Sequence, residues 1–327
     1  MKDLGQKMRV RKATVAALLV FAGAAMAEDS ERAAAVAAFE RHDGHAALSL
    51  FDALRQKFPG DAEILFYLGR SQVLVHRAKS AVENLQHAVE LAPQKSDYHL
   101  YLAEALGAYL DEAGVLKKVS LSSDIHRELE QAVALDPHSA DAHEGLMTYY
   151  LQAPALFGGD LDKARAESAA IMNIDPARGY ETQALILQHE EKTAEAIASF
   201  QKAIALAPKT MSMRFELGTL YDEQQRYAES RAVWQDMIKA DPKYAAAYYR
   251  AGRTAVLSGE HLQEGEQALK TYLQFPASDP SPAAAHWRLG NLYEKMQRKE
   301  QARAEYQASL SADPEFAEAK KSLNGLD

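Results

Sequence analysis

Two stretches of the chain repeat one another and decide its fold: LFYLGRSQVLVHRAKSAVENLQHAVELAP (Leu65–Pro93) and LGTLYDEQQRYAESRAVWQDMIKADP (Leu217–Pro242). In each, a small residue and then a bulky one follow a Leu-Gly pair, and a proline ends the stretch. The small and bulky residues are Ala81 and Leu85 in the first stretch and Ser230 and Trp234 in the second. Apolar residues recur at intervals of three and four, which predicts amphipathic helices. Each stretch is therefore expected to form a pair of helices.

Prolines mark the ends of eight such stretches. They are Pro59, Pro93, Pro137, Pro176, Pro208, Pro242, Pro276 and Pro314, at spacings of 34, 44, 39, 32, 34, 34 and 38 residues. Proline stops a helix because it lacks an N–H and its ring collides with the preceding turn. A single helix pair cannot bury its apolar face, whereas stacked copies bury a continuous core. The spacing therefore indicates an array of helix pairs, with small residues allowing close approach and bulky residues filling the gaps.

This phased pattern resembles the tetratricopeptide repeat family over residues 28–315. The resemblance implies an all-α superhelical solenoid of about eight antiparallel helix pairs. A C-terminal capping helix is expected over residues 316–327, and the first unit, from Glu28, is expected to cap the other end. The small and bulky positions hold in most units, so eight copies in phase make the assignment specific.

Residues 1–27 have the pattern of a secretory signal peptide. Five basic residues precede an apolar run from Ala13 to Met26, and Ala25-Met26-Ala27 fits the small-x-small cleavage pattern. Met8 is an alternative start. Cleavage after Ala27 predicts a periplasmic bacterial protein, and the alternatives are secretion or an uncleaved anchor. The apolar run is shorter than the roughly 20 residues that span a bilayer, so no membrane span is expected after cleavage.

Composition excludes several classes of function. The 327 residues include 37 Lys and Arg, 46 Asp and Glu, and no Cys, for a formal charge of −9. Without cysteine there is no disulfide, thiolate zinc site or cysteine nucleophile. An acidic chain lacks the basic footprint of a nucleic-acid-binding protein. No nucleic-acid partner is therefore expected.

Two units depart from the repeat length. The third carries surplus residues near 112–121, interpreted either as a lengthened loop between helices or as an extended helix or flap. The fourth carries Ala153-Pro154-Ala155-Leu156-Phe157-Gly158-Gly159-Asp160. Pro154 is expected to stop a helix, the glycines permit positive φ, and Asp160 can cap the next helix. A stiff connection over 278–282 precedes the eighth unit, whose first helix is expected to begin near Ala283.

The family resemblance places the first helix of each pair on a concave groove that binds partners. Carried over position by position, it predicts ten partner-binding residues: Phe66, Arg70, Leu100, Glu104, Phe215, Thr219, Tyr249, Arg253, Trp287 and Asn291. Aromatic and Arg side chains carry much of the energy of protein interfaces, although some of these side chains can pack against the neighbouring repeat instead. Some relatives clamp a C-terminal carboxylate with Lys and Asn at two of these positions, and only Asn291 matches that pair.

No catalytic, cofactor or metal site is expected. The chain has no His-Glu-x-x-His, Gly-x-Ser-x-Gly or dinucleotide-binding motif. Its 11 histidines are expected at the surface. The predicted function is a non-enzymatic scaffold that binds a peptide or an envelope component in the groove. Two alternatives remain: a structural envelope subunit that docks through its convex face, and, less favoured, an enzyme or metal-dependent factor that uses the insertions.

Overall fold

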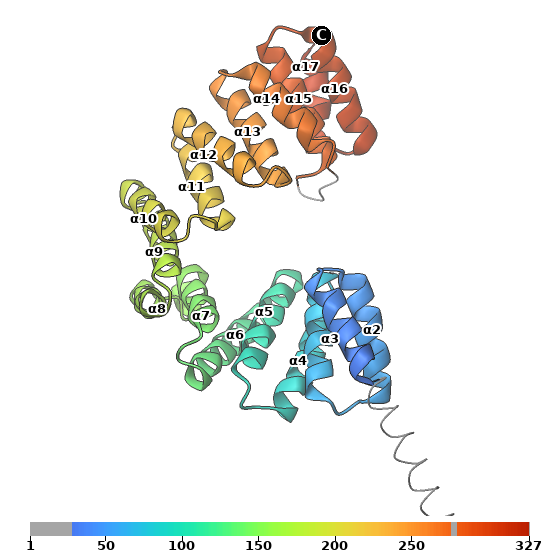
Figure 1. Ribbon diagram of the computed structural model, residues 1–327, viewed down its shortest axis with the longest axis vertical. Coiled ribbons are helices and arrows are strands. Elements are labelled where there is room, and N and C mark those ends of the chain that lie inside the picture. The colour runs from blue at the N-terminus through green and yellow to red at the C-terminus, as the bar shows by residue number, and fades with distance from the viewer. Residues whose placement is uncertain (1–27, 276–279, 327) are drawn as a thin grey trace, which may run out of the picture. The chain divides into compact units, whose positions relative to one another are not determined.

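The computed structural model describes residues 28–275 and 280–326, and every regular element within these ranges is a helix (Figure 1). The predicted signal peptide, Pro276 and residues 278–279 of the predicted stiff connection lie outside the described residues. Residues 28–40 form the first described helix. The helices that follow are α2 (Gly44–Lys57), α3 (Ala62–Leu74), α4 (Ala78–Leu91), α5 (Ser96–Glu112), α6 (Val115–Leu135), α7 (Ala140–Gln152), the 3-10 turn η1 (Ala155–Phe157), α8 (Leu161–Ile174), α9 (Pro176–His189), α10 (Thr193–Leu206), α11 (Met211–Glu223), α12 (Tyr227–Ala240), α13 (Ala245–Ser258), α14 (Leu262–Tyr272), α15 (Pro282–Lys295), α16 (Lys299–Ala312) and α17 (Ala317–Gly325). The all-α prediction is confirmed.

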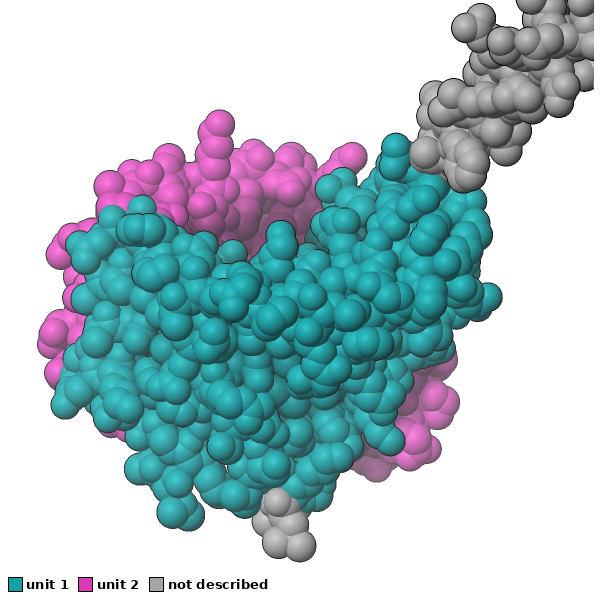
Figure 2. Space-filling view, turned by 90° about the horizontal axis from the view of Figure 1, so that it is seen from below, with its two compact units in different colours: residues 1–174 teal, residues 175–327 magenta. Residues whose placement is uncertain are grey.

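The helices form consecutive pairs, each with a first and a second helix. Within a pair the two helices pack together, as α3 does with α4 and α15 with α16, and most second helices also pack on the first helix of the next pair. The described chain divides into two compact units, of which the first reaches Ile174 and the second begins at Asp175 (Figure 2).

In four pairs, a glycine of the first helix packs closely against a bulky residue of the second helix. A Cβ added to Gly218 would lie 2.5 Å from the Trp234 ring, and one added to Gly290 would lie 2.3 Å from the Tyr306 ring. Gly69 meets Leu85 and Gly252 meets Leu269 in the same way. The expected pairing of small and bulky positions is confirmed, because only a residue without Cβ allows these helices to approach so closely.

Helix boundaries follow the proline and cap positions of the sequence. In the pairs where the structure describes the closing proline, the second helix ends two residues before it, as Leu91 precedes Pro93. Pro176 instead occupies the first turn of α9, where its missing N–H costs nothing. Several first helices begin with an oxygen-bearing cap. In α3 the carboxylate of Asp61 accepts the backbone N–H groups of Glu63 and Ile64.

The surplus residues of the third unit lie in its helices. The 17-residue α5 and the 21-residue α6 are joined by a connection of two residues, Ala113 and Gly114. The extended-helix interpretation is therefore right, and the lengthened-loop interpretation is wrong. Apolar residues continue at helical spacing on both sides of the connection, so the surplus residues lengthen α5 and α6 and not the loop between them.

The fourth unit behaves largely as its residues predict. Pro154 follows the end of α7, and Asp160 accepts the backbone N–H groups of Asp162 and Lys163 at the start of α8. Only one of the two glycines uses positive φ, Gly158 at +94°. Gly159 is needed for a different reason, because a Cβ there would collide with the Ala153 carbonyl oxygen at 1.7 Å.

Buried histidines correct the expectation that all histidines lie at the surface. His99 and His143 are 6% and 7% exposed. The Nδ1 atom of His99 lies 2.6 Å from Glu128 of the second helix, and that of His143 lies 2.5 Å from Glu167. His286 and Glu305 repeat this pairing at 2.7 Å in the last pair. These histidines join the first helix of a pair to the second, because a buried polar ring requires a hydrogen-bonding partner.

A second recurring contact, a side-chain hydrogen bond to a proline carbonyl, stabilises the proline turns. Four residues that lie six positions after a closing proline reach back to that proline's carbonyl oxygen. They are His99 to Pro93, His143 to Pro137, Arg214 to Pro208 and Tyr248 to Pro242. Each contact gives a hydrogen-bonding partner to the carbonyl of a proline that lies in the turn after a helix.

The array closes with α17, which follows the eighth pair as expected. It begins at Ala317, one residue after the predicted Phe316, and Leu326 serves as its C-cap residue in place of Gly325. Ala319 is fully buried, and Leu326 joins the core cluster of the last pairs. The helix therefore covers one apolar edge and presents charged residues outward. In the eighth pair, α15 begins at Pro282 with Ser281 as its cap, one residue before the predicted start.

Candidate partner-binding surface

All ten predicted partner-binding residues lie on first helices. Phe66 and Arg70 are on α3, and Leu100 and Glu104 are on α5. The remaining six lie in the second unit: Phe215 and Thr219 on α11, Tyr249 and Arg253 on α13, and Trp287 and Asn291 on α15. In the first unit α3 contacts α5, and in the second α13 contacts α15. We call the surface formed by the first helices of a unit its first-helix face.

Three of the predicted residues are core side chains. Phe66, Leu100 and Tyr249 are 4%, 6% and 8% exposed. The Phe66 ring stacks on Tyr98 of the next first helix, with centroids 4.4 Å apart, and Tyr249 lies against Tyr272 at 5.4 Å. The Phe66 contact joins neighbouring repeats and the Tyr249 contact joins the two helices of one pair. All three side chains offer little area to a partner. Sequence position alone does not distinguish this role from groove lining.

Arg70 is held among aromatic rings in the first unit. Its guanidinium carbon lies 3.7 Å from the centroid of Tyr101 and 4.5 Å from that of Phe39. It also lies over the rings of Phe66 and Tyr67. Cation–π contacts of this kind stabilise the charge without a carboxylate. Arg70 is therefore largely committed to packing within its own unit.

Glu104 is the exposed member of the first-unit set. Its pKa is raised above the ordinary value, chiefly because surrounding protein removes water from the carboxyl group. Asp141 adds to the rise, and the positive charge of Arg70 opposes it. The first-helix face of this unit is thus acidic around Glu104.

The second unit pairs aromatic rings with arginines. Phe215 and Trp287 are half-buried. The guanidinium carbon of Arg250 lies 4.7 Å from the Phe215 centroid, and that of Arg288 lies 4.3 Å from the Trp287 centroid. Trp287 also donates its Nε1–H to Ser322 at 3.1 Å. The Phe215 ring packs against Trp234, and this contact and the Ser322 hydrogen bond limit the movement of the two rings under the arginines.

Two of these arginines lack an anionic partner. Within the described residues, the guanidinium groups of Arg250 and Arg288 form no hydrogen bond and no ion pair, although both lie over aromatic rings. The pKa of Arg250 is lowered, first by burial and then by the neighbouring charge of Arg253, with Asp222 and Glu216 opposing. Arg250 therefore holds its charge beside the carboxylates of Asp222 and Glu216 without a direct ion pair to either.

Arg253 is anchored through a buried polar network. Its Nη1 lies 3.3 Å from Oδ2 of Asp222, whose side chain is fully buried. Ser230 donates to Asp222 at 2.7 Å, and Thr254 lies 2.8 Å from the same carboxylate oxygen and accepts the Nε1–H of Trp234. Burial raises the pKa of Asp222, while these hydrogen bonds and Arg253 oppose the rise. The network ties α11, α12 and α13 together and positions Arg253.

Buried polar atoms without a partner gather on the same helices. Among the described residues, three buried side-chain nitrogen or oxygen atoms have no hydrogen-bonding partner: Nε of Arg214, Oγ1 of Thr219 and Nε of Arg288. All three lie on α11 or α15. Unpaired buried donors are rare because each one costs free energy. Asn291 differs, since its side-chain oxygen accepts the hydroxyl of Tyr306 at 2.7 Å.

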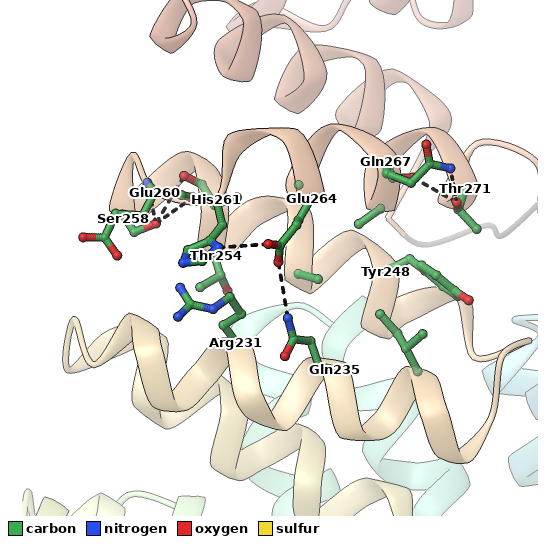
Figure 3. A pocket seen from close by; sticks show the side chains of 15 residues that line it. Arg231, Gln235, Tyr248, Thr254, Ser258, Glu260, His261, Glu264, Gln267 and Thr271 are labelled. Carbon is green, nitrogen blue, oxygen red and sulfur yellow. Dashed lines mark hydrogen bonds and ion pairs between the residues drawn. The ribbon is translucent and has the colours of Figure 1, made fainter.

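A pocket opens on the side of the second helices, between α12 and α14 with α13 as its floor (Figure 3). Its volume is about 180 Å³. Small side chains of α13 and α14, including Ala251, Ala255 and Ala268, line it. Polar side chains such as Arg231 and Glu264 lie at its rim. No sequence pattern predicted this pocket, although the small residues Ala251, Ala255 and Ala268 are visible in the sequence.

The described residues offer neither a metal-binding cluster nor a membrane-spanning helix. Within the ranges that the structure covers, no group of three or more His, Cys, Asp or Glu side chains is placed to hold a metal ion. Among the described helices, none is both long and apolar enough to cross a bilayer.

Comparisons with known proteins agree with the fold. Models of the tetratricopeptide repeat match residues 181–245, 215–273 and 283–316. A curated relative, anaphase-promoting complex subunit 3 of Schizosaccharomyces pombe, is 21% identical over 295 residues. That match covers 88% of this chain but only 41% of the relative.

Solved structures show the same architecture. A thermophilic TPR protein of Thermus thermophilus matches 59% of this chain and 98% of its own, with a TM-score of 0.52 and 24% identity. Yeast Tom70 matches 86% of this chain and 58% of its own, with a TM-score of 0.62 and 15% identity. The APC/C hetero-tetramer Cut9-Hcn1 matches 86% of this chain and 52% of its own, with a TM-score of 0.53 and 15% identity. At these identities the likeness shows the fold alone.

Proposed function

Because this chain is a tetratricopeptide repeat protein, we propose that it is a non-enzymatic scaffold whose second unit binds an acidic peptide segment on its first-helix face. The fold is one that typically serves protein–protein interaction. One observation carries the choice of surface: Arg250 and Arg288 lie on aromatic rings, and their guanidinium groups form no ion pair among the described residues. Guanidinium groups supported in this way suit carboxylates, which they bind with two parallel hydrogen bonds.

The surrounding residues fit such a ligand. The hydroxyl of Thr219 on α11 is buried and unpaired, and Phe215 and Trp287 supply half-buried aromatic area. Aromatic and Arg side chains dominate the energy of protein interfaces. The first-helix face of the first unit is less suitable for an acidic segment, because Glu104 is exposed there and Arg70 is surrounded by rings. We further propose, from the signal-peptide pattern of residues 1–27, that the partner is a component of the bacterial cell envelope.

A peptide titration tests this function. Fluorescence anisotropy would measure binding of a labelled ten-residue peptide of alternating Glu and Leu, and of the matching Lys and Leu peptide. We expect the acidic peptide to bind at least tenfold more tightly. The double variant Arg250→Gln/Arg288→Gln should remove that preference, and rising salt should weaken the parent's binding.

The control is Arg226→Gln, since Arg226 is exposed and already paired with Glu229 at 2.7 Å. This variant should bind like the parent. Equal affinity of the parent for the acidic and basic peptides would reject the proposed surface. A crosslinking pull-down from the periplasmic fraction would then identify the natural partner of a protein that passes this test.

A further inference from the structure

The buried ring of His99 on α5 faces an acceptor oxygen at each of its two nitrogens. Its Nδ1 lies 2.6 Å from Oε2 of Glu128, and its Nε2 lies 3.0 Å from the carbonyl oxygen of Pro93. A carbonyl oxygen and an ionised carboxylate can only accept a hydrogen bond, whereas a neutral imidazole carries a single N–H. Both contacts are therefore hydrogen bonds only when this pair holds one proton more than a neutral ring beside a carboxylate.

The surroundings of this pair place the additional proton on the ring. Oε1 of the buried Glu128 accepts a hydrogen bond from Nη2 of Arg127 at 3.0 Å, and an adjacent positive charge favours the ionised carboxylate. Within the described residues, His99 forms no hydrogen bond or ion pair with any charged side chain besides Glu128. The arrangement is therefore that of an imidazolium ion between a carboxylate and a carbonyl oxygen.

His143 on α7 repeats the arrangement in the next helix pair. Its Nδ1 lies 2.5 Å from Oε2 of Glu167 on α8, and its Nε2 lies 3.1 Å from the carbonyl oxygen of Pro137. Among the described residues, Glu167 has no ion pair with a Lys or Arg side chain, so His143 is its one charged partner. Burial, together with the charges of Glu130 and Glu167, raises the pKa of Tyr150 to about 12. Tyr150 therefore stays neutral near this pair and leaves the charge balance to His143.

The last helix pair contains a histidine with only one of the two acceptors. Nδ1 of His286 lies 2.7 Å from Oε2 of Glu305, and Nε2 has no hydrogen-bonding partner within the part of the chain that the structure describes. A neutral ring that carries its proton on Nδ1 satisfies this contact completely. His286 is also half-buried, whereas His99 and His143 are buried. It therefore provides a matched comparison within the same chain.

We propose that His99 and His143 are imidazolium ions in the folded protein at neutral pH and that they make the packing of α5–α8 sensitive to pH. Each ring joins the second helix of its pair to the proline turn before the first helix. Loss of the proton would leave a buried ring nitrogen facing an acceptor without a hydrogen. Because the folded state binds more protons than the unfolded chain, whose histidines lose theirs near about pH 6.5, stability falls as the pH rises above that value.

Nitrogen-15 NMR of the histidine rings in the full chain tests the protonation state. At about pH 7.5 we expect the signals of a doubly protonated ring for His99 and His143, and those of a singly protonated ring for His286. Each of three variants perturbs the signals of one ring and so assigns them: Glu128→Gln, Glu167→Gln and Glu305→Gln.

Hydrogen exchange of the same proteins tests the effect on packing. A glutamine amide can donate an N–H to Nδ1, so a neutral ring in Glu128→Gln/Glu167→Gln keeps both contacts by donating from Nε2. Relative to this double variant at the same pH, opening of α5–α8 in the parent should increase about tenfold per pH unit for each proton released, between about pH 6.5 and 8. The control Glu305→Gln should leave the pH dependence of exchange in α15 and α16 unchanged.

Two results would overturn the proposal. The first is a neutral ring for His99 and His143 at about pH 7.5. The second is the same pH dependence of exchange over α5–α8 in the parent and in Glu128→Gln/Glu167→Gln. Circular dichroism shows whether the double variant folds, and if it does not, each single variant is compared with the parent over its own helix pair.

Discussion

At Gly218, the absence of a side chain allows α11 to pack closely against α12. The Trp234 ring covers it from the second helix, and three ring carbons would lie within 2.9 Å of an added Cβ. That ring is fully buried, and its Nε1–H is held by Thr254 at 3.0 Å. The ring therefore has little freedom to move aside.

We expect Gly218→Ala to destabilise the protein. Overpacking of a fixed core contact costs about 1–3 kcal/mol, which exceeds the gain from replacing a helical glycine. The matched control is Gly107→Ala in α5, where no heavy atom lies within 4 Å of the added Cβ. That variant should gain about 0.5–1 kcal/mol from helix propensity. Urea unfolding of both variants measures the difference, and a neutral or stabilising Gly218→Ala would show that α11 and α12 can separate freely.

The sequence predicted the close contact between Gly218 and Trp234. It did not predict which side chains are available to a partner on the first helices. Small and bulky positions recur in phase with the prolines, so their contact follows from helical geometry. Whether Phe66 lines a groove or packs on Tyr98 depends on how far the next repeat rotates, which no local pattern encodes. The recurring contact from His99 to Pro93 could have been found, because the spacing of six residues is repeated at His143, Arg214 and Tyr248.

At the scale of elements, Asp61 carries two functions at the start of α3. It caps the helix through two backbone N–H groups, and it pairs with Arg32 of the helix over residues 28–40 at 2.8 Å. Burial raises the pKa of Asp61, but the hydrogen bonds from Arg32 and the backbone outweigh it, so the pKa lies below its ordinary value of 3.8. A lowered pKa means that folding favours the ionised form.

We therefore expect this contribution to be complete above about pH 4 and to be lost as the pH falls through the lowered pKa of the folded state. Asp61→Asn keeps the cap but removes the ion pair, and should cost about 0.5–1 kcal/mol at neutral pH. Asp61→Ala removes both and should cost about 1–2 kcal/mol. Urea unfolding of the parent and both variants between pH 2.5 and 7 measures this. A difference between parent and Asp61→Asn that persists unchanged at the lowest pH would contradict the ion-pair assignment.

Element lengths were only partly predictable. The spacing of 44 residues between Pro93 and Pro137 shows that the third unit is long, yet the sequence left open where the surplus lies. Apolar residues continue at helical spacing on both sides of Gly114, so α5 and α6 extend until only two residues link them. The pocket over α13 was missed for a related reason. Its small residues resemble the small positions that close other helix pairs, and only the three-dimensional spacing of α12 and α14 shows that they leave space.

At the scale of the whole molecule, the second unit has what it needs to fold alone. In a repeat array, stability is a sum of repeat and nearest-neighbour terms, so a block of complete pairs can retain its structure. The unit begins with an intact cap, because Asp175 accepts the N–H groups of Ala177 and Arg178 at the start of α9. It ends with α17, which covers the last pair.

We expect the fragment comprising residues 175–327 to be monomeric, helical by circular dichroism and cooperative in thermal unfolding. Gly218→Ala should lower its Tm by about 2–4 °C per kcal/mol lost, as expected for a domain of this size. The same substitution in the full chain should shift the transition of the second unit alone, while Asp61→Ala should shift that of the first. A fragment without a cooperative transition would show that the contacts of α9 through α17 are insufficient by themselves. A common shift of both transitions by either substitution would show that the two units unfold as one, since coupling between repeats would then exceed the stability of each block.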